Sequence, residues 1–160
     1  MPIGIIALKK DIVKKLNNNK KKIFFGGTFS GNSISMYISN KVVNYIYKNK
    51  KMIFSNLEKK SKFAQKKINQ FFKQQNIDAK CLRFSSMMRI VFSNEKIVNR
   101  TQRDFFENKK KTIINDFKKY LFKNKIYYLN NGIIFLATST NSKDINHFIE
   151  ITKKAFKKFY

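Results

Sequence analysis

The sequence contains very little cysteine, histidine, proline and glycine. Its one cysteine, Cys81, cannot form an internal disulfide, as expected for a chain that works in a reducing compartment. A single histidine, His147, leaves no His/Cys cluster of the kind that binds zinc. No apolar run reaches the roughly 20 residues that a membrane span needs, and no secretory signal opens the chain. These absences predict a cytoplasmic protein and give no support to metal chemistry.

Acidic residues are also scarce: 9 Asp and Glu stand against 35 Lys and Arg, for a net charge of +26. A basic surface gains affinity for nucleic acid by releasing counterions, so a small basic nucleic-acid-binding protein is one hypothesis. A biased composition is the other, because the abundant Lys, Asn, Ile, Phe and Tyr all have A/T-rich codons. The lysines are scattered over every predicted helix, with few aromatic residues between them, which favours the second interpretation.

The residues that are abundant predict one folded domain with a Phe-rich core, since 42% are hydrophobic and 17 are Phe. The first half predicts a buried strand, a short helix and two longer helices, the first capped by Asn32 and the second closed by Asn76. These elements are Pro2–Leu8, Lys10–Leu16, Ser33–Lys48 and Met52–Gln74. A buried strand needs neighbouring strands, and residues 1–25 supply none, so we expect the rest of its sheet to be missing.

The second half predicts short adjacent strands between helices. Two strands precede a helix, two more flank a tight turn at Asn130-Asn131-Gly132, and a final helix has Ser142 as its N-cap. The expected ranges are Cys81–Phe84, Met87–Phe92, Asp104–Lys123 (helix), Ile126–Leu129, Ile133–Ala137 and Ser142–Phe159 (helix). The fold class is therefore α/β, with a small mixed or antiparallel sheet covered by helices.

One segment carries a chemical signal: Gly26-Gly27-Thr28-Phe29-Ser30-Gly31-Asn32, directly before a helix. Glycines let backbone N–H groups approach an anion, a Thr or Ser hydroxyl adds a donor, and the helix N-terminus adds a favourable dipole. The segment lacks the Gly-Lys-Ser/Thr ending of a P-loop and the spacing of a dinucleotide fingerprint. Alone, it predicts either a phosphate-binding loop or an ordinary loop and cap.

The same segment resembles the Gly-Thr-Phe/Leu-Ser/Gly-Gly-Asn-Pro segment of class III pyridoxal-phosphate (PLP) aminotransferases, especially glutamate-1-semialdehyde aminomutases. Met1-Pro2-Ile3-Gly4 is similar to the strand that precedes it in that family, and Lys10-Asp11-Ile12 to the short helix between them. Ser86 to Phe92 and the final helix resemble later parts of the family, more loosely. Ser33 departs from the pattern by standing where the family usually has proline.

The resemblance implies the C-terminal part of a PLP-dependent transferase of fold type I. Residues 1–45 would be a remnant of the large PLP-binding domain and residues 46–160 the small domain. The whole enzyme would transfer or move an amino group by way of a lysine Schiff base. Gly27 and Thr28 would bind the phosphate of PLP held by the neighbouring subunit, across a dimer interface. The implied partners are a second subunit or the rest of the large domain, together with a small-molecule amino donor and acceptor.

The resemblance also implies what these residues do not supply. The family's Schiff-base lysine precedes the Pro-Ile-Gly strand, and its pyridine-binding aspartate lies further upstream, so we expect the chain alone to be inactive. Asn130-Asn131-Gly132 replaces an acidic residue of the aminomutases, and Ser139-Thr140-Asn141 replaces a histidine, which leaves the specificity undefined. A regulatory chain that docks on an intact homologue is a third hypothesis.

Five other residues stand out less. Arg83 and Arg89 are predicted to face solvent from their strands, with a grip on a substrate carboxylate as the alternative. Cys81 is interpreted as a core residue rather than a catalytic thiol, and His147 as a surface or boundary residue. Arg103, next to Asp104, is predicted to arrange charge at a helix start.

Overall fold

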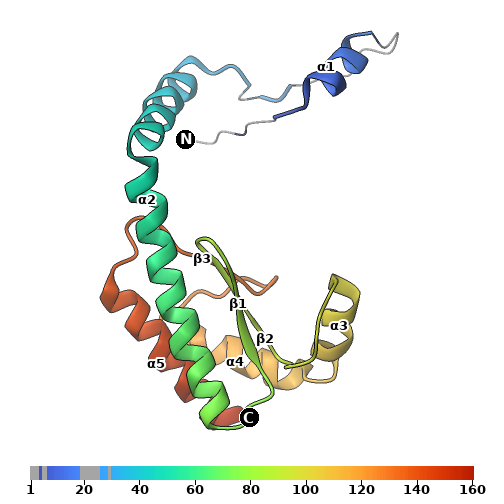
Figure 1. Cartoon of the computed structure of the whole chain (residues 1–160), viewed down its shortest axis with the longest axis vertical. Helices are drawn as coiled ribbons and strands as arrows, with labels where there is room; N and C mark the ends of the chain where they lie inside the picture. The colour runs from blue at the N-terminus through green and yellow to red at the C-terminus, as the bar shows by residue number, and fades with distance from the viewer. Residues whose placement is uncertain (1–3, 5–6, 19–25, 29) are drawn as a thin grey trace. The chain divides into compact units, whose positions relative to one another are not determined.

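The computed structural model describes residues 4, 7–18, 26–28 and 30–160, and these form two compact units, residues 1–50 and 51–160 (Figure 1). The elements, in chain order, are α1 (Lys10–Asn17), α2 (Ser33–Gln74), β1 (Lys80–Phe84), β2 (Met87–Val91), α3 (Arg100–Asn108), α4 (Lys111–Lys123), β3 (Ile133–Phe135) and α5 (Ser142–Phe159). Within the described ranges, no helix is long and apolar enough to cross a membrane.

The first unit contains α1 and the N-terminal part of α2. The short helix predicted from Lys10 to Leu16 is confirmed as α1. The strand predicted from Pro2 to Leu8 lies largely outside the described residues, as does Phe29 of the glycine-rich segment.

Helix α2 runs for 42 residues, so the prediction of two helices separated near residue 50 is wrong. The expected break lies in Lys48-Asn49-Lys50-Lys51, which contains neither glycine nor proline. Lysine is a good helix former, and the Asn49 side chain donates back to the carbonyl of Tyr45 at 2.9 Å, inside the helix. The change in apolar pattern at this point therefore marks a change in surroundings and not an end of the helix.

Helix α2 ends where the sequence predicts, at Asn76. This residue has a φ of 50°, and its N–H donates to the Lys73 carbonyl at 3.3 Å. The next N–H, of Ile77, donates to the Phe72 carbonyl at 2.9 Å. The two bonds form a Schellman motif, in which Asn tolerates the left-handed conformation better than most side chains.

The second unit is built on an antiparallel sheet of order β1-β2-β3. The register pairs Cys81 with Ile90 and Met88 with Ile134, so one face carries these side chains. That face is buried against α2, α4 and α5, which confirms the predicted two-layer arrangement. The opposite face carries Phe84, 76% exposed, beside Met87 and Phe135 in the same row.

The core under this sheet is aromatic. The Phe156 ring of α5 lies 4.6 Å from Phe72, 5.2 Å from Phe92 and 5.3 Å from Phe117, measured between ring centroids. Each such pair contributes about 0.5–1.5 kcal/mol beyond burial of its area. The Phe-rich composition thus builds one cluster that joins α2, α4 and α5 to the end of β2.

Three predicted elements in this unit need correction. The helix predicted from Asp104 to Lys123 is two helices, because no apolar side chain between Phe106 and Ile113 anchors the lysine run to the core. The strand predicted at Ile126–Leu129 is extended chain without a ladder partner, although the side chains of Ile126 and Tyr128 do pack against the core. The strand that returns after the tight turn stops at Phe135, two residues early.

The last helix begins as predicted but with a different cap. Asn141, not Ser142, is the N-cap: its side chain accepts from the N–H of Asp144 at 3.0 Å. The Asp144 carboxylate accepts from the N–H of Asn141 at 2.9 Å, which completes a capping box.

Candidate cofactor-phosphate site

The glycine-rich segment forms a turn that leads directly into α2. The N–H of Ser30 donates to the Gly27 carbonyl at 2.9 Å and closes the turn. Gly31 follows with a φ of 73°, a conformation that side chains other than glycine rarely adopt. Gly31 is therefore explained by the backbone alone.

Gly27 has a different explanation. Its φ lies outside the left-handed region, and among the described residues a Cβ placed on it would meet only Ser30 Oγ, at an ordinary 3.6 Å. Neither the turn nor the packing demands glycine at this position. A glycine that the fold does not need is one that leaves room for a ligand to approach the backbone, so this position fits a phosphate cradle.

The start of α2 adds donors to this turn. Asn32 is the N-cap, as predicted: its side chain accepts from the N–H of Ser35 at 3.0 Å, and its carbonyl accepts from Met36 at 2.9 Å. By helix geometry, the N–H groups of Ser33 and Ile34 have no partner within the helix. They point toward the side from which an anion would approach, where the helix dipole favours negative charge.

Thr28 and its neighbours are open to solvent, including Gly26, Gly27 and Ser30. In the described part of the first unit, Asp11 is the only acid, so little negative charge opposes a phosphate there. The geometry supports binding of an anion through backbone N–H groups and the Thr28 hydroxyl. The described loop residues, 26–28 and 30–32, include no Lys, His, Asp or Glu, and among the described residues no group of His, Cys, Asp or Glu suits a metal ion.

The structure contradicts the prediction that the strand arginines face solvent. The Arg83 side chain is only 18% exposed, and its Nη1 lies 3.1 Å from Glu58 Oε1. The Arg89 side chain is also 18% exposed; its Nη2 lies 2.8 Å from Glu107 Oε2, and its Nη1 donates to the Asn131 carbonyl. Both guanidinium groups are engaged within the unit and are not presented to a substrate.

The remaining candidates have structural roles. Cys81 is buried, and burial raises the pKa of its thiol to about 12, so it is a core residue and not a reactive thiolate. His147 is exposed, with Nε2 2.9 Å from the Asn124 carbonyl, which confirms a surface residue. Asp104 lies within α3, and hydrogen bonding from Arg103, with a smaller contribution from Arg100, holds the pKa of its carboxyl below the usual range.

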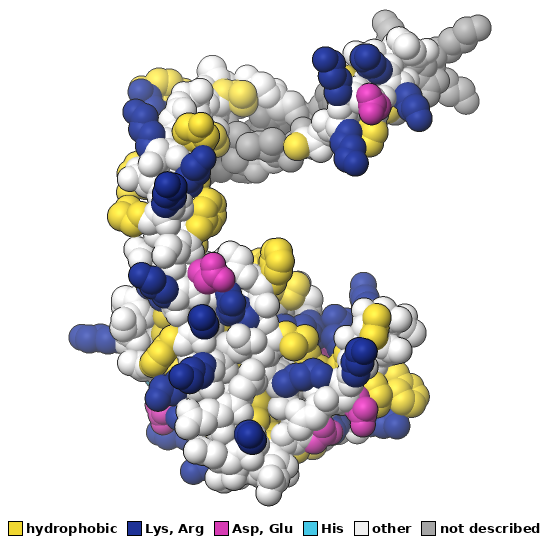
Figure 2. Space-filling view, viewed as in Figure 1, with side chains coloured by type: hydrophobic (Ala, Val, Ile, Leu, Met, Phe, Trp, Pro, Cys, Tyr) yellow, Lys and Arg dark blue, Asp and Glu magenta, His cyan; other side chains and the backbone are white. Residues whose placement is uncertain are grey.

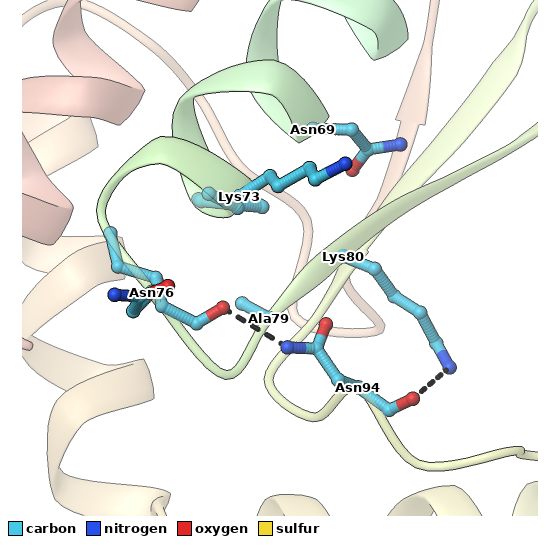
Figure 3. Close-up of a pocket in the computed structure, with 8 residues that line it drawn as sticks. Asn69, Lys73, Asn76, Ala79, Lys80 and Asn94 are labelled. Atoms are coloured by element: carbon cyan, nitrogen blue, oxygen red, sulfur yellow. Dashed lines mark hydrogen bonds between the residues drawn. The ribbon is translucent and has the colours of Figure 1, made fainter.

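A cavity of about 420 Å³ lies in the second unit, where α2 ends and β1 begins (Figure 3). Three asparagines and two lysines line it, above an apolar floor. The lining residues are Asn69, Phe72, Lys73, Asn76, Ile77, Ala79, Lys80 and Asn94. The sequence does not predict that these residues line one cavity, because nothing in their spacing shows that they meet.

Two of the three asparagines of this cavity, Asn69 and Asn94, hydrogen-bond to backbone groups. Asn69 accepts from the N–H of Cys81 at 2.7 Å and donates to its carbonyl at 3.0 Å, so it pairs with the outer edge of β1 as a strand would. Asn94 donates to the Ile77 carbonyl at 3.1 Å, and Lys80 Nζ donates to the Asn94 carbonyl at 3.3 Å. The polar lining therefore joins the sheet to α2.

Comparison with known proteins identifies relatives of this chain. No family model matches the chain. Glutamate-1-semialdehyde 2,1-aminomutase of Caldicellulosiruptor bescii is 29% identical over 159 residues, which cover 96% of this chain and 35% of that protein. The same enzyme of Caldicellulosiruptor saccharolyticus is 29% identical over 164 residues, covering 99% of this chain and 36% of that protein. The resemblance to class III aminotransferases is confirmed.

Solved structures give the fold. An omega-transaminase from Sphaerobacter thermophilus matches 85% of this chain with a TM-score of 0.68 at 13% identity, over 30% of that protein. A glutamate-1-semialdehyde aminomutase from Pseudomonas aeruginosa, in complex with PMP, matches 85% with the same TM-score at 10% identity, over 29% of that protein. The fold is that of the C-terminal part of a PLP-dependent transferase. The chain spans about a third of the length of the curated relatives it matches.

Proposed function

We propose that these 160 residues form the C-terminal part of a PLP-dependent aminotransferase or aminomutase. The observation that carries the proposal is the turn at Gly27 and Thr28, placed at the N-terminus of α2 in a chain that is similar to such enzymes. Bound PLP would supply the electron sink for amino-group transfer. The role of this chain would be to bind and orient the cofactor phosphate with the N–H groups and hydroxyl of this loop.

We also propose that this loop serves the site of a neighbouring subunit. The described loop residues, 26–28 and 30–32, offer donors for an anion but include no Lys, His, Asp or Glu, so the reacting groups would come from elsewhere in the assembly. On this proposal the isolated chain does not turn over an amino donor, and amino-donor turnover by the purified chain with added PLP would refute it.

The phosphate contact can be tested without activity. Inorganic phosphate and PLP are titrated separately into the chain, and backbone amide shifts are followed by NMR. We expect shifts centred on Gly27, Thr28 and Ser33, and about tenfold or greater weakening with Thr28→Val, since a hydrogen bond to a charged group is worth about 1.5–3 kcal/mol.

The matched control is Thr138→Val, at another exposed threonine, in the second unit. This substitution should leave both titrations unchanged. Shifts that spread over surface lysines, with no difference between the Thr28 and Thr138 variants, would show that the anion binds by charge alone and would remove the basis of the proposal.

A further inference from the structure

The N-terminal part of α2 exposes a large apolar surface. Between residues 34 and 47, nine large apolar side chains are 38% to 68% exposed: Ile34, Met36, Tyr37, Ile38, Val42, Val43, Tyr45, Ile46 and Tyr47. Figure 2 shows hydrophobic side chains on more than one side of this part of the helix. We call these nine residues the apolar face of α2. Monomeric proteins rarely leave so much contiguous apolar surface in water.

The distribution of these residues around the helix is that of a buried helix. At 100° per residue, Ile34, Ile38, Val42, Tyr45 and Ile46 fall within about 120°, and most of the others extend the apolar arc to roughly 220°. The remaining strip is mainly polar, with Tyr37 as the one member of the nine on it: Asn40 and Asn44 lie there, with their side chains hydrogen-bonded to each other at 2.9 Å. A helix that is apolar over more than half of its circumference needs cover on more than one side.

The charge around the apolar face restricts what can cover it. On α2 itself, four lysines (41, 48, 50 and 51) and no acidic residue lie between positions 33 and 57. The nearest acids in sequence are Asp11 and Glu58, and Glu58 already pairs with Arg83. If two copies of this chain met through this face, each would bring lysines against lysines, with no nearby series of acids to compensate. Like charges brought within a Debye length, about 8 Å at physiological salt, repel.

We infer that the apolar face of α2 is covered by an acidic protein surface that lies outside these 160 residues, and not by a second copy of them. The occupant presents an apolar centre to Ile38 and Val42 and carries Asp or Glu at its rim, opposite Lys41 and Lys48. The inference rests on the proposed function only for the choice of probe, because the missing part of a transferase is the first candidate for such a surface.

The test uses the part of the Caldicellulosiruptor bescii aminomutase that lies outside its similarity to this chain, co-expressed with the full chain. Analytical ultracentrifugation should find the chain alone monomeric at micromolar concentration and a 1:1 complex with the probe. The complex should weaken as salt rises, because charge pairs at the rim are screened.

Two variants, each of which introduces an aspartate, locate the contact. Val42→Asp places a charge within the apolar face and should weaken the complex by about tenfold or more. Asn40→Asp makes the same charge change on the polar strip of the same helix and should leave the affinity within a few-fold. Both positions are exposed, so neither substitution should unfold the second unit.

Three results overturn the inference: a dimer of the chain that Val42→Asp disrupts and Asn40→Asp does not, no complex with the probe, or a complex that strengthens with salt. Failure of the proposed function is separate. A complex that forms through Val42 but whose PLP titration is unaffected by Thr28→Val would leave the inference standing and refute the phosphate role.

Discussion

The ion pair of Arg89 and Glu107 offers the most quantitative test of the second unit. Arg89 Nη2 lies 2.8 Å from Glu107 Oε2, and the two side chains are only 18% and 14% exposed. Arg89 also donates to the Asn131 carbonyl, and its Nε is buried without a partner. Arg103 Nε lies 3.7 Å from the same Glu107 oxygen. Glu107 therefore faces two guanidinium groups, but Arg103 also pairs with Asp104, whereas Glu107 is the one charged partner of Arg89 among the described residues.

Because of this asymmetry, we expect substitutions of Glu107 and of Arg89 to lower the free energy of unfolding by different amounts. Removing one member of a buried pair costs about 3–5 kcal/mol, and residual exposure lowers that figure here. Glu107→Gln leaves Arg89 without a charged partner, while Arg103 keeps Asp104, so we expect a loss of about 2–3 kcal/mol of unfolding free energy. Arg89→Met leaves Glu107 facing Arg103 and fills the space with apolar atoms, so we expect about 1–2 kcal/mol.

Urea unfolding followed by circular dichroism measures these differences at constant m-value. The double variant should lose less than the sum of the two single losses, by about 1 kcal/mol, because the pair is removed once. Arg100→Met, at an arginine whose side chain is 83% exposed, is the matched control and should change little. Additive single losses, or a larger loss for Arg89→Met than for Glu107→Gln, would refute the reasoning.

Three shorter predictions test the cap, the core and the buried thiol. Asn141→Ala should cost about 1 kcal/mol in urea unfolding and Ser142→Ala much less, because only the first caps α5; equal losses would contradict the observed capping box. Phe156→Ala should cost about 3–5 kcal/mol and Phe122→Ala, at a side chain that is 68% exposed, no more than a few tenths; a small loss at Phe156 would mean that the aromatic cluster is loosely packed. Since burial raises the pKa of Cys81 to about 12, the folded chain should resist a thiol reagent at pH 8 and react on unfolding; rapid reaction without denaturant would contradict its burial.

The sequence predicted most reliably those features that depend on neighbours along the chain. The Asn32 cap, the turn at Asn130-Asn131-Gly132 and the end of α2 at Asn76 each rest on bonds within five residues. The two adjacent strands β1 and β2 also followed from their local pattern, while their antiparallel pairing was left open between a mixed and an antiparallel sheet. The candidate loop was predicted for the same reason, since a glycine-rich turn and a helix start are local.

Features that depend on distant residues could not be predicted. The local pattern predicts that Arg89 faces solvent. Its partner Glu107 lies on α3, 18 positions away in sequence, so the pattern around Arg89 does not reveal the ion pair. The segment Ile126–Leu129 has the side-chain pattern of a strand but no hydrogen-bonded partner strand among the described residues. A local sequence pattern cannot show whether such a partner strand is present. The role proposed for Gly27 rests on both levels: its motif indicated a phosphate, and the backbone showed a left-handed φ at Gly31 and not at Gly27.

The two parts of helix α2 differ in what stabilises them. Its C-terminal part buries Ala64, Ile68 and Phe72 in the core of the second unit, so packing stabilises the helix there. Its N-terminal part is rich in β-branched residues, such as Val42 and Val43, which lose side-chain freedom in a helix and are poor helix formers in isolation. Helical stability in proteins comes mainly from packing of the apolar face, so this part should gain order when that face is covered. Because the phosphate loop precedes the same helix, covering the apolar face of α2 would also fix the donors of Gly27 and Thr28 in place. On this reasoning, binding of the partner and of the cofactor phosphate should strengthen each other.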